Sequence, residues 1–152
     1  MRPLLVFLLL LVTPAWAQSG LSPAHLAKLK QFGPKIVVAG YIPPGAKLVK
    51  VDVEIDKRFG NSYFIRYKGP GKAEFTVQAA NGGIGDGPDG DPYPFNSPVM
   101  GKGTLYLDNS QKTVWSGWLS LPGQQFPVFA LAGSNLDPAT AVKIVESFRL
   151  QK

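Results

Sequence analysis

The sequence predicts an α+β domain: a curved antiparallel sheet of about six strands, covered on one face by a C-terminal helix, with a short N-terminal helix beside it. Apolar and polar residues alternate through the middle of the chain, which is typical of strands that bury one face. Near each end, a residue that commonly caps helices stands directly before a proline, which is typical of a helix start.

The strongest strand signal lies in three consecutive stretches. Residues 49–56 place an aliphatic side chain at every second position with a charged one between, and residues 63–68 and 74–79 also alternate. Short turns separate the stretches, so they predict an antiparallel meander whose opposed charges pair on the exposed face. Weaker signals predict further strands over 104–107, 113–121 and 126–132.

Each predicted helix begins at a capping residue. Ser22 begins a short amphipathic helix expected over 23–32. Asp137 begins a longer helix, expected over 138–150, in which apolar residues recur every three or four positions. The apolar stripe of this second helix is the natural cover for the buried face of the sheet.

The first 17 residues have the pattern of a cleavable secretory signal peptide. Arg2 precedes an apolar run over 4–12, and the small residues Ala15 and Ala17 form a cleavage site. The run is shorter than the ~20 residues that a membrane span needs. Cleavage and export are therefore expected, and the alternative is an uncleaved anchor helix.

After this segment, residues 18–22 are expected to form a flexible entry and residues 23–152 a single domain, either periplasmic or secreted. No transmembrane segment is expected in it. The chain has no cysteine, which excludes disulfides, thiolate metal sites and cysteine nucleophiles. Its 16 basic and 10 acidic residues give a net charge of +6, and the basic residues are scattered. Without a binding motif, this charge predicts no nucleic-acid partner and only a weak attraction to an anionic membrane surface.

Segment 81–98 is rich in glycine and proline and predicts a long loop, a kind of segment that is often functional. Asp86, Asp89 and Asp91 cluster in it. Their carboxylates could form a calcium site, because calcium takes oxygen ligands, although the spacing is not that of the helical calcium loop. The alternative is that they cap tight turns beside glycine and proline. No other cofactor is expected.

Trp115 and Trp118 stand in one expected strand, where side chains three positions apart point to opposite faces. One tryptophan should therefore enter the core, and the other, with Tyr106 nearby, could stack on a sugar ring or another flat ligand. The candidate ligand-binding residues are Asn81, Asp86, Tyr93, Tyr106, Trp115 and Trp118. No catalytic residue is predicted, because the only histidine, His25, lies at the border of an apolar stripe and no motif supplies a nucleophile with its base.

Three motifs follow one another along the chain. Tyr-Ile-Pro-Pro-Gly at 41–45 precedes an alternating strand, Gln-Ala-Ala-Asn-Gly-Gly-Ile-Gly-Asp at 78–86 ends a later one, and an Asp-Pro pair begins the last helix. This order resembles small exported bacterial domains of unknown function, and similar domains occur outside the membrane in anti-sigma-type regulators. The resemblance implies an α+β sheet domain with no assigned catalysis.

These observations predict a binding or interaction module that is not an enzyme. Its partner would be a protein, a glycan or a small ligand, bound near segment 81–98 and the tryptophan strand. The alternative is a carrier of lipid or another hydrophobic ligand, with a cavity between the sheet and its covering helix. The volume between sheet and helix distinguishes the two functions, because a carrier needs an open apolar cavity there.

Overall fold

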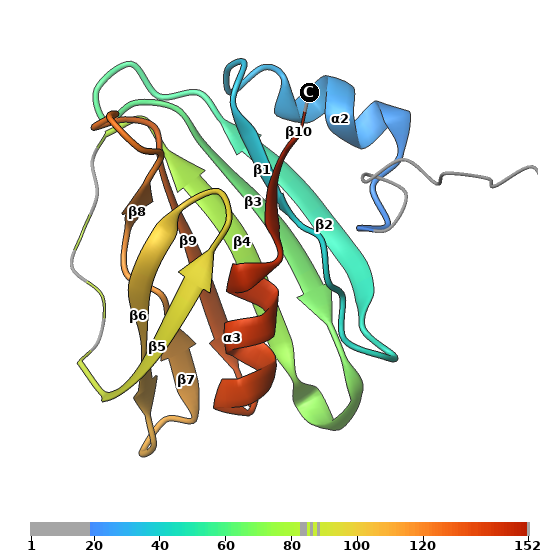
Figure 1. Cartoon of the computed structure of the whole chain (residues 1–152). Coiled ribbons are helices and arrows are strands. Elements are labelled where there is room, and N and C mark those ends of the chain that lie inside the picture. The colour runs from blue at the N-terminus through green and yellow to red at the C-terminus, as the bar shows by residue number, and fades with distance from the viewer. Residues whose placement is uncertain (1–18, 83–84, 86, 88, 152) are drawn as a thin grey trace, which may run out of the picture.

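The protein is built in two layers, and the computed structural model describes residues 19–82, 85, 87 and 89–151. One layer is an open, antiparallel eight-stranded sheet; the other consists of two helices and a two-stranded sheet that lie on one face of it (Figure 1). The mixed α+β class is therefore confirmed. The elements in chain order are α2 (Pro23–Leu29), β1 (Ile36–Ala39), β2 (Lys47–Glu54), β3 (Ser62–Lys68), the 3-10 turn η1 (Pro70–Lys72), β4 (Glu74–Ala80), β5 (Asp91–Ser97), β6 (Gly101–Asp108), β7 (Thr113–Trp115), β8 (Leu119–Ser120), β9 (Val128–Ser134), α3 (Pro138–Glu146) and β10 (Phe148–Gln151).

The predicted meander is present in β2, β3 and β4, but the sheet does not continue in chain order. The strand order is β2-β3-β4-β9-β7-β6-β5, and β8 also pairs with β9. Because β9 inserts beside β4, the connection from β4 to β5 must travel from the middle of the sheet to its far edge. This connection carries the glycines and aspartates that the sequence singles out.

The inner layer covers the sheet with three pieces, visible side by side in Figure 1. Helix α2 lies against β2, the β1–β10 pair lies over the middle of the sheet, and α3 packs on β5, β6 and β9. The side chains at this interface exclude water, since Phe75, Phe129, Ile144 and Phe148 are all no more than 1% exposed. Burial of such side chains is the main stabilising contribution in a domain of this size. None of the described helices has the length and apolar character to cross a membrane.

The last helix is shorter than predicted. Helix α3 ends at Glu146, and residues 148–151 form β10, which pairs with β1 in antiparallel register. Ser147 sits at the helix end, where its hydroxyl accepts the N–H of Tyr41 at 2.8 Å. The prediction of one helix to residue 150 was wrong. An apolar residue at position 148 suits a helix stripe as well as a buried strand, and the pairing with the distant strand β1 decides for the strand.

Part of the predicted loop is a strand. Segment 91–97 is β5, the edge strand of the sheet, paired along its length with β6. Pro92 and Pro94 lack an N–H group and are tolerated at an edge, where no neighbour needs that donor. Two residues further along, at the next position whose backbone N–H points away from β6, Asn96 donates its N–H to Glu146 Oε1 of α3 at 2.9 Å. Three successive outward positions of this edge therefore offer no free donor to a further strand, which protects it from edge pairing.

A buried tyrosine hydroxyl joins the two layers. Tyr63 of β3 donates to the carbonyl of Val37 and accepts its N–H, each at 2.8 Å, and both residues are 0% exposed. Burial raises the pKa of Tyr63, so the hydroxyl keeps its proton. In the same way Tyr67 donates to the carbonyl of Ser19 at 2.9 Å. Ser19, which belongs to the segment predicted to be a flexible entry, is buried and accepts this hydrogen bond. The predicted signal peptide lies outside the described residues.

Candidate functional site

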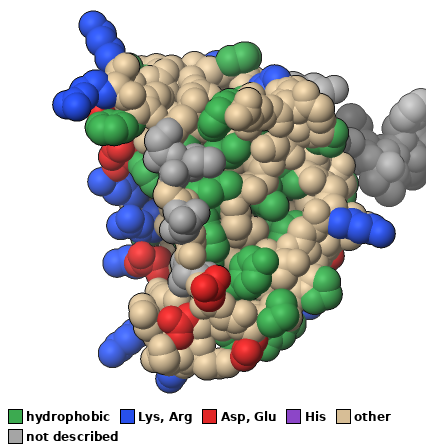
Figure 2. Space-filling model, turned by 90° about the vertical axis from the view of Figure 1, so that its left-hand side faces the viewer, with side chains coloured by type: hydrophobic (Ala, Val, Ile, Leu, Met, Phe, Trp, Pro, Cys, Tyr) green, Lys and Arg blue, Asp and Glu red, His purple; other side chains and the backbone are tan. Residues whose placement is uncertain are grey.

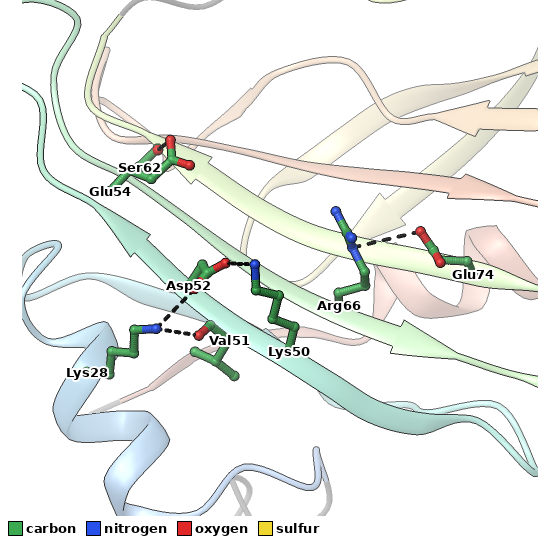
Figure 3. Close-up of polar contacts among 8 residues, drawn as sticks. All are labelled: Lys28, Lys50, Val51, Asp52, Glu54, Ser62, Arg66 and Glu74. Carbon is green, nitrogen blue, oxygen red and sulfur yellow. Dashed lines mark hydrogen bonds and ion pairs between the residues drawn. The ribbon is translucent and has the colours of Figure 1, made fainter.

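The face of the large sheet that points away from the inner layer, called the outer face here, carries paired charges over β2, β3 and β4 (Figure 3). Asp52 forms ion pairs with Lys50 and, at 3.1 Å, with Lys28 of α2. These two cations hold the pKa of Asp52 below its ordinary value. On β4, Glu74 lies 3.8 Å from both Arg66 and Lys68. Opposed charges therefore do pair on the exposed face, but the pairs expected between β2 and β3 are replaced by pairs within β2, with α2, and between β3 and β4. Each of the two carboxylates has two cations beside it, so this half of the face is positive.

Both tryptophans emerge on the outer face, so the prediction that one of them enters the core was wrong. Trp115 pairs with Ala132 and Leu119 with Phe129. Between those pairs the tryptophan strand advances 119 − 115 = 4 residues while β9 advances 132 − 129 = 3. The extra residue is a bulge, with Gly117 at φ +66, and it reverses the side to which Trp118 points.

The two indole rings form one aromatic unit beneath the β4–β5 connection. Their centroids are 5.2 Å apart and their planes meet at 87°, an edge-to-face contact. Trp118 Nε1 donates to the carbonyl of Gly85 at 2.7 Å. A Cβ placed on Gly87 would come within 1.7 Å of Trp115 Nε1, so only glycine allows this approach. The described part of the connection is thus fixed to the outer face by both tryptophans.

A groove of about 350 Å³ opens beside Trp118 and is called the outer-face groove. Residues from five parts of the chain meet in it: the end of β2, the following turn, β3, the end of β4, and the bulge. The groove is lined by Glu54, Asp56, Phe59, Gly60, Ser62, Phe64, Gln78, Ala79, Ala80, Gly82 and Trp118. In Figure 2, Lys and Arg side chains gather along the left-hand margin with acidic side chains among them, and further acidic side chains lie toward the lower part of this face.

The turn after β2 presents the most exposed aromatic ring of the groove. Asp56 Oδ1 accepts the N–H groups of Arg58 and Phe59 at 2.6 and 2.9 Å, which closes a tight turn. These hydrogen bonds, that from Phe59 first, lower the pKa of Asp56, so its carboxylate stays ionised at neutral pH. Phe59 is left 61% exposed at the tip. Beside it, Glu54 accepts the hydroxyl of Ser62 at 3.3 Å.

Of the six predicted ligand-binding residues, the structure brings three together. Tyr106 pairs with Trp115 across neighbouring strands on the outer face, and Trp118 joins them through the bulge. Tyr93 belongs to the opposite face, where it packs against the core. The side chain of Asn81 points toward the inner layer, with Nδ2 3.5 Å from the carbonyl of Phe32. Asp86 lies outside the described residues.

The structure describes two of the three predicted calcium ligands, Asp89 and Asp91. Asp89 and Asp91 are both exposed, and Asp91 accepts a hydrogen bond from the side chain of Asn109. Among the residues that the structure describes, no three acidic or histidine side chains come close enough to hold a metal ion. Because Asp86 lies outside that part of the chain, a calcium site here stays a prediction.

Sequence reasoning missed most residues of the groove. Phe64 could have been found, since it stands among Ser62 and Arg66 on the polar side of an alternating strand, where an aromatic ring is unexpected. Phe59 also carries a signal, as a large aromatic residue in a turn. Their proximity to Trp118 depends on strand order and on the bulge, and neither can be inferred from the alternation of apolar and polar residues.

A second hollow, of about 450 Å³, lies at the margin of the inner layer between α2 and the β1–β10 pair. It is lined by Leu26, Lys30, Gly33, Pro34, Ile36 and Gln151. This hollow is mainly apolar, and it is not the space between the sheet and α3. It could therefore take an apolar ligand, and it is separate from the groove beside Trp118.

Comparison with protein-family models, with curated proteins and with solved structures finds no significant match. The resemblance to exported domains of unknown function and to regulators of the anti-sigma type accordingly stays a hypothesis. What the protein does must be argued from its own surface.

Proposed function

We propose that the protein is an exported, non-catalytic binding module that recognises its ligand in the outer-face groove. One observation carries this proposal: Phe59, Phe64 and Trp118, from three separate segments, converge on one concave site with polar groups between them. Concave sites that combine aromatic walls with a few polar groups are the usual form of small-ligand sites. In the described part of the chain, the groove lies on the face of the large sheet opposite the inner layer.

The ionisation of the carboxyl groups supports a role in binding. A carboxyl that donates a proton in catalysis near neutral pH needs a raised pKa. In the described residues, the aspartates with displaced pKa values are all displaced downward, by hydrogen bonds or ion pairs; they are Asp52, Asp56, Asp108 and Asp137. Of these only Asp56 lines the groove, where its ionised carboxylate can contact a ligand.

The alternative, a carrier with its ligand between sheet and helix, is less well supported. The residues of α3 that face the sheet, Ala141, Ile144 and Val145, are 0% exposed, as is Leu131 opposite them on β9. A carrier would need that interface to open. An apolar ligand would fit instead in the hollow beside α2, which Ile36 lines. A lipid that slows hydrogen exchange at Ile36 would favour the carrier.

The proposal is tested by a thermal-shift screen with small amines, sugars, organic anions and aliphatic compounds. A true ligand raises the melting temperature, because it binds only the folded protein. We expect the shift to be lost in Trp118→Ala and retained in Leu150→Ala, which removes an exposed apolar side chain on the opposite layer. Shifts that survive Trp118→Ala for every ligand would place binding elsewhere and refute the proposal.

Export is tested separately by mass spectrometry of the protein from its own host. Cleavage after Ala17 is expected to leave an N-terminus at Gln18. A protein that still begins at Met1 would refute cleavage and favour the anchor helix.

A further inference from the structure

The outer-face groove combines three aromatic rings with two carboxylates, and we infer that its ligand is a small organic cation that presents an ammonium group. This inference rests on the proposed function, since it names the ligand class for the same groove. Aromatic rings attract ammonium groups through their π faces, and carboxylates attract them through their charge.

The charge of the lining residues is the first argument. The chain is strongly basic, with 16 basic and 10 acidic residues, yet the described residues that line this groove include no lysine, arginine or histidine. Its two charged side chains are Glu54 and Asp56. Elsewhere on the outer face, Asp52 and Glu74 are already neutralised by neighbouring lysines and arginines. Within the described chain no ion pair involves Glu54 or Asp56, so their charges remain available to a ligand. A neighbouring hollow, which shares Glu54 and Phe64, is lined by Lys50 and Arg66 as well.

The state of the aromatic rings is the second argument. The indole N–H of Trp118 is already bound to the carbonyl of Gly85, so this ring offers the ligand its π system and not its donor. Phe59 already takes a cation, because the guanidinium carbon of Arg58 lies 5.5 Å from its ring centroid. Arg58 does not line the groove. Because two cations repel each other, a ligand cation would replace Arg58 on Phe59 or use the other face of that ring.

The size of the groove limits the ligand. A volume of about 350 Å³ is at the low end of the range for small-molecule sites. It suits a headgroup of the size of choline. A neutral sugar could also stack on Trp118, and the two ligand classes differ in whether binding depends on positive charge.

The test compares choline with its carbon isostere, in which a tert-butyl group replaces trimethylammonium, by tryptophan fluorescence and calorimetry on the mature protein. The shapes match, so the difference in affinity reports the charge. We expect choline to bind about tenfold more tightly than the isostere, and higher salt to reduce this preference.

Two variants separate the groove from the rest of the surface. Glu54→Gln keeps the shape of the side chain and should lower the affinity for choline several-fold while leaving that for the isostere unchanged. Glu74→Gln, an acidic residue of the same face outside the groove, should change neither. Free choline and phosphatidylcholine vesicles identify the source of the ammonium group, and binding of either one supports the inference.

Equal binding of choline and its isostere would overturn the inference, as would a neutral sugar that binds in a Trp118-dependent manner while choline does not. Both results leave the outer-face groove as a binding site. If Trp118→Ala alters the binding of no compound, the proposed function fails as well, so the two failures are distinguishable.

Discussion

Replacement of Tyr63 by phenylalanine tests how the two layers are joined. The change removes one hydroxyl from a ring that is 0% exposed, and leaves the ring itself in place. In the native protein this hydroxyl bonds both the N–H and the carbonyl of Val37, each at 2.8 Å. Val37 is also 0% exposed, so no water can take over those bonds without opening the structure.

The expected cost follows from those two groups. A buried donor or acceptor that loses its partner costs about 1–3 kcal/mol. With both groups of Val37 affected, Tyr63→Phe should lower the free energy of unfolding by about 2–5 kcal/mol. Tyr67→Phe is the matched control, since it removes a single hydrogen bond, to the carbonyl of Ser19, and should cost about 1 kcal/mol.

Urea denaturation followed by tryptophan fluorescence measures both values. Because neither change alters the surface exposed on unfolding, the midpoint should shift while the slope stays constant. If the two variants lose equal stability, or if Tyr63→Phe loses under ~1 kcal/mol, the hydroxyl of Tyr63 does not hold β1 against the sheet and the reasoning is refuted.

Three further predictions concern single features. Gly87→Ala should displace the β4–β5 connection or turn Trp115, seen as a shift in tryptophan emission, whereas Gly85→Ala, which has open space, should leave the spectrum unchanged. Asp137→Ala should cost about 0.5–2 kcal/mol by removing the cap of α3. The hydrogen bonds from Thr140 lower the pKa of Asp137 in the folded protein, so this contribution is complete above the unfolded pKa and is lost as the pH falls through the folded value; the wild type and the variant should converge in acid. Calcium at millimolar levels should raise the melting temperature if the aspartates of the β4–β5 connection bind it, and an unchanged melting temperature would count against that site.

The central strands could be predicted because one face of them is buried. In β3, Tyr63, Ile65 and Tyr67 alternate with exposed residues, and the structure buries all three. The same alternation exists in β5, where Tyr93 and Phe95 point inward, but the prolines between them suggested a loop. Only the position of β5 at the edge of the sheet makes those prolines harmless, and that position depends on strand order.

The candidate site was harder to predict than the fold, because it depends on register. Tyr106 was expected near one of the two tryptophans, and it pairs with Trp115. The direction of Trp118 depends on a one-residue bulge against β9, and the pairing with a distant partner that creates it cannot be read from alternation alone. The end of α3 is a similar case, since Phe148 fits an apolar stripe in a helix and in a strand alike.

The most direct test of the account is an NMR titration of the mature, isotope-labelled protein with choline. The account predicts that the indole N–H of Trp118 and the amides of Ser62 and Gly82, which line the outer-face groove, shift together and saturate. The amides of β1 and β10, in the other layer, should stay in place. Shifts confined to those two strands would contradict the assignment of the groove as the binding site, and no shift at any residue would contradict the assignment of an ammonium ligand to it.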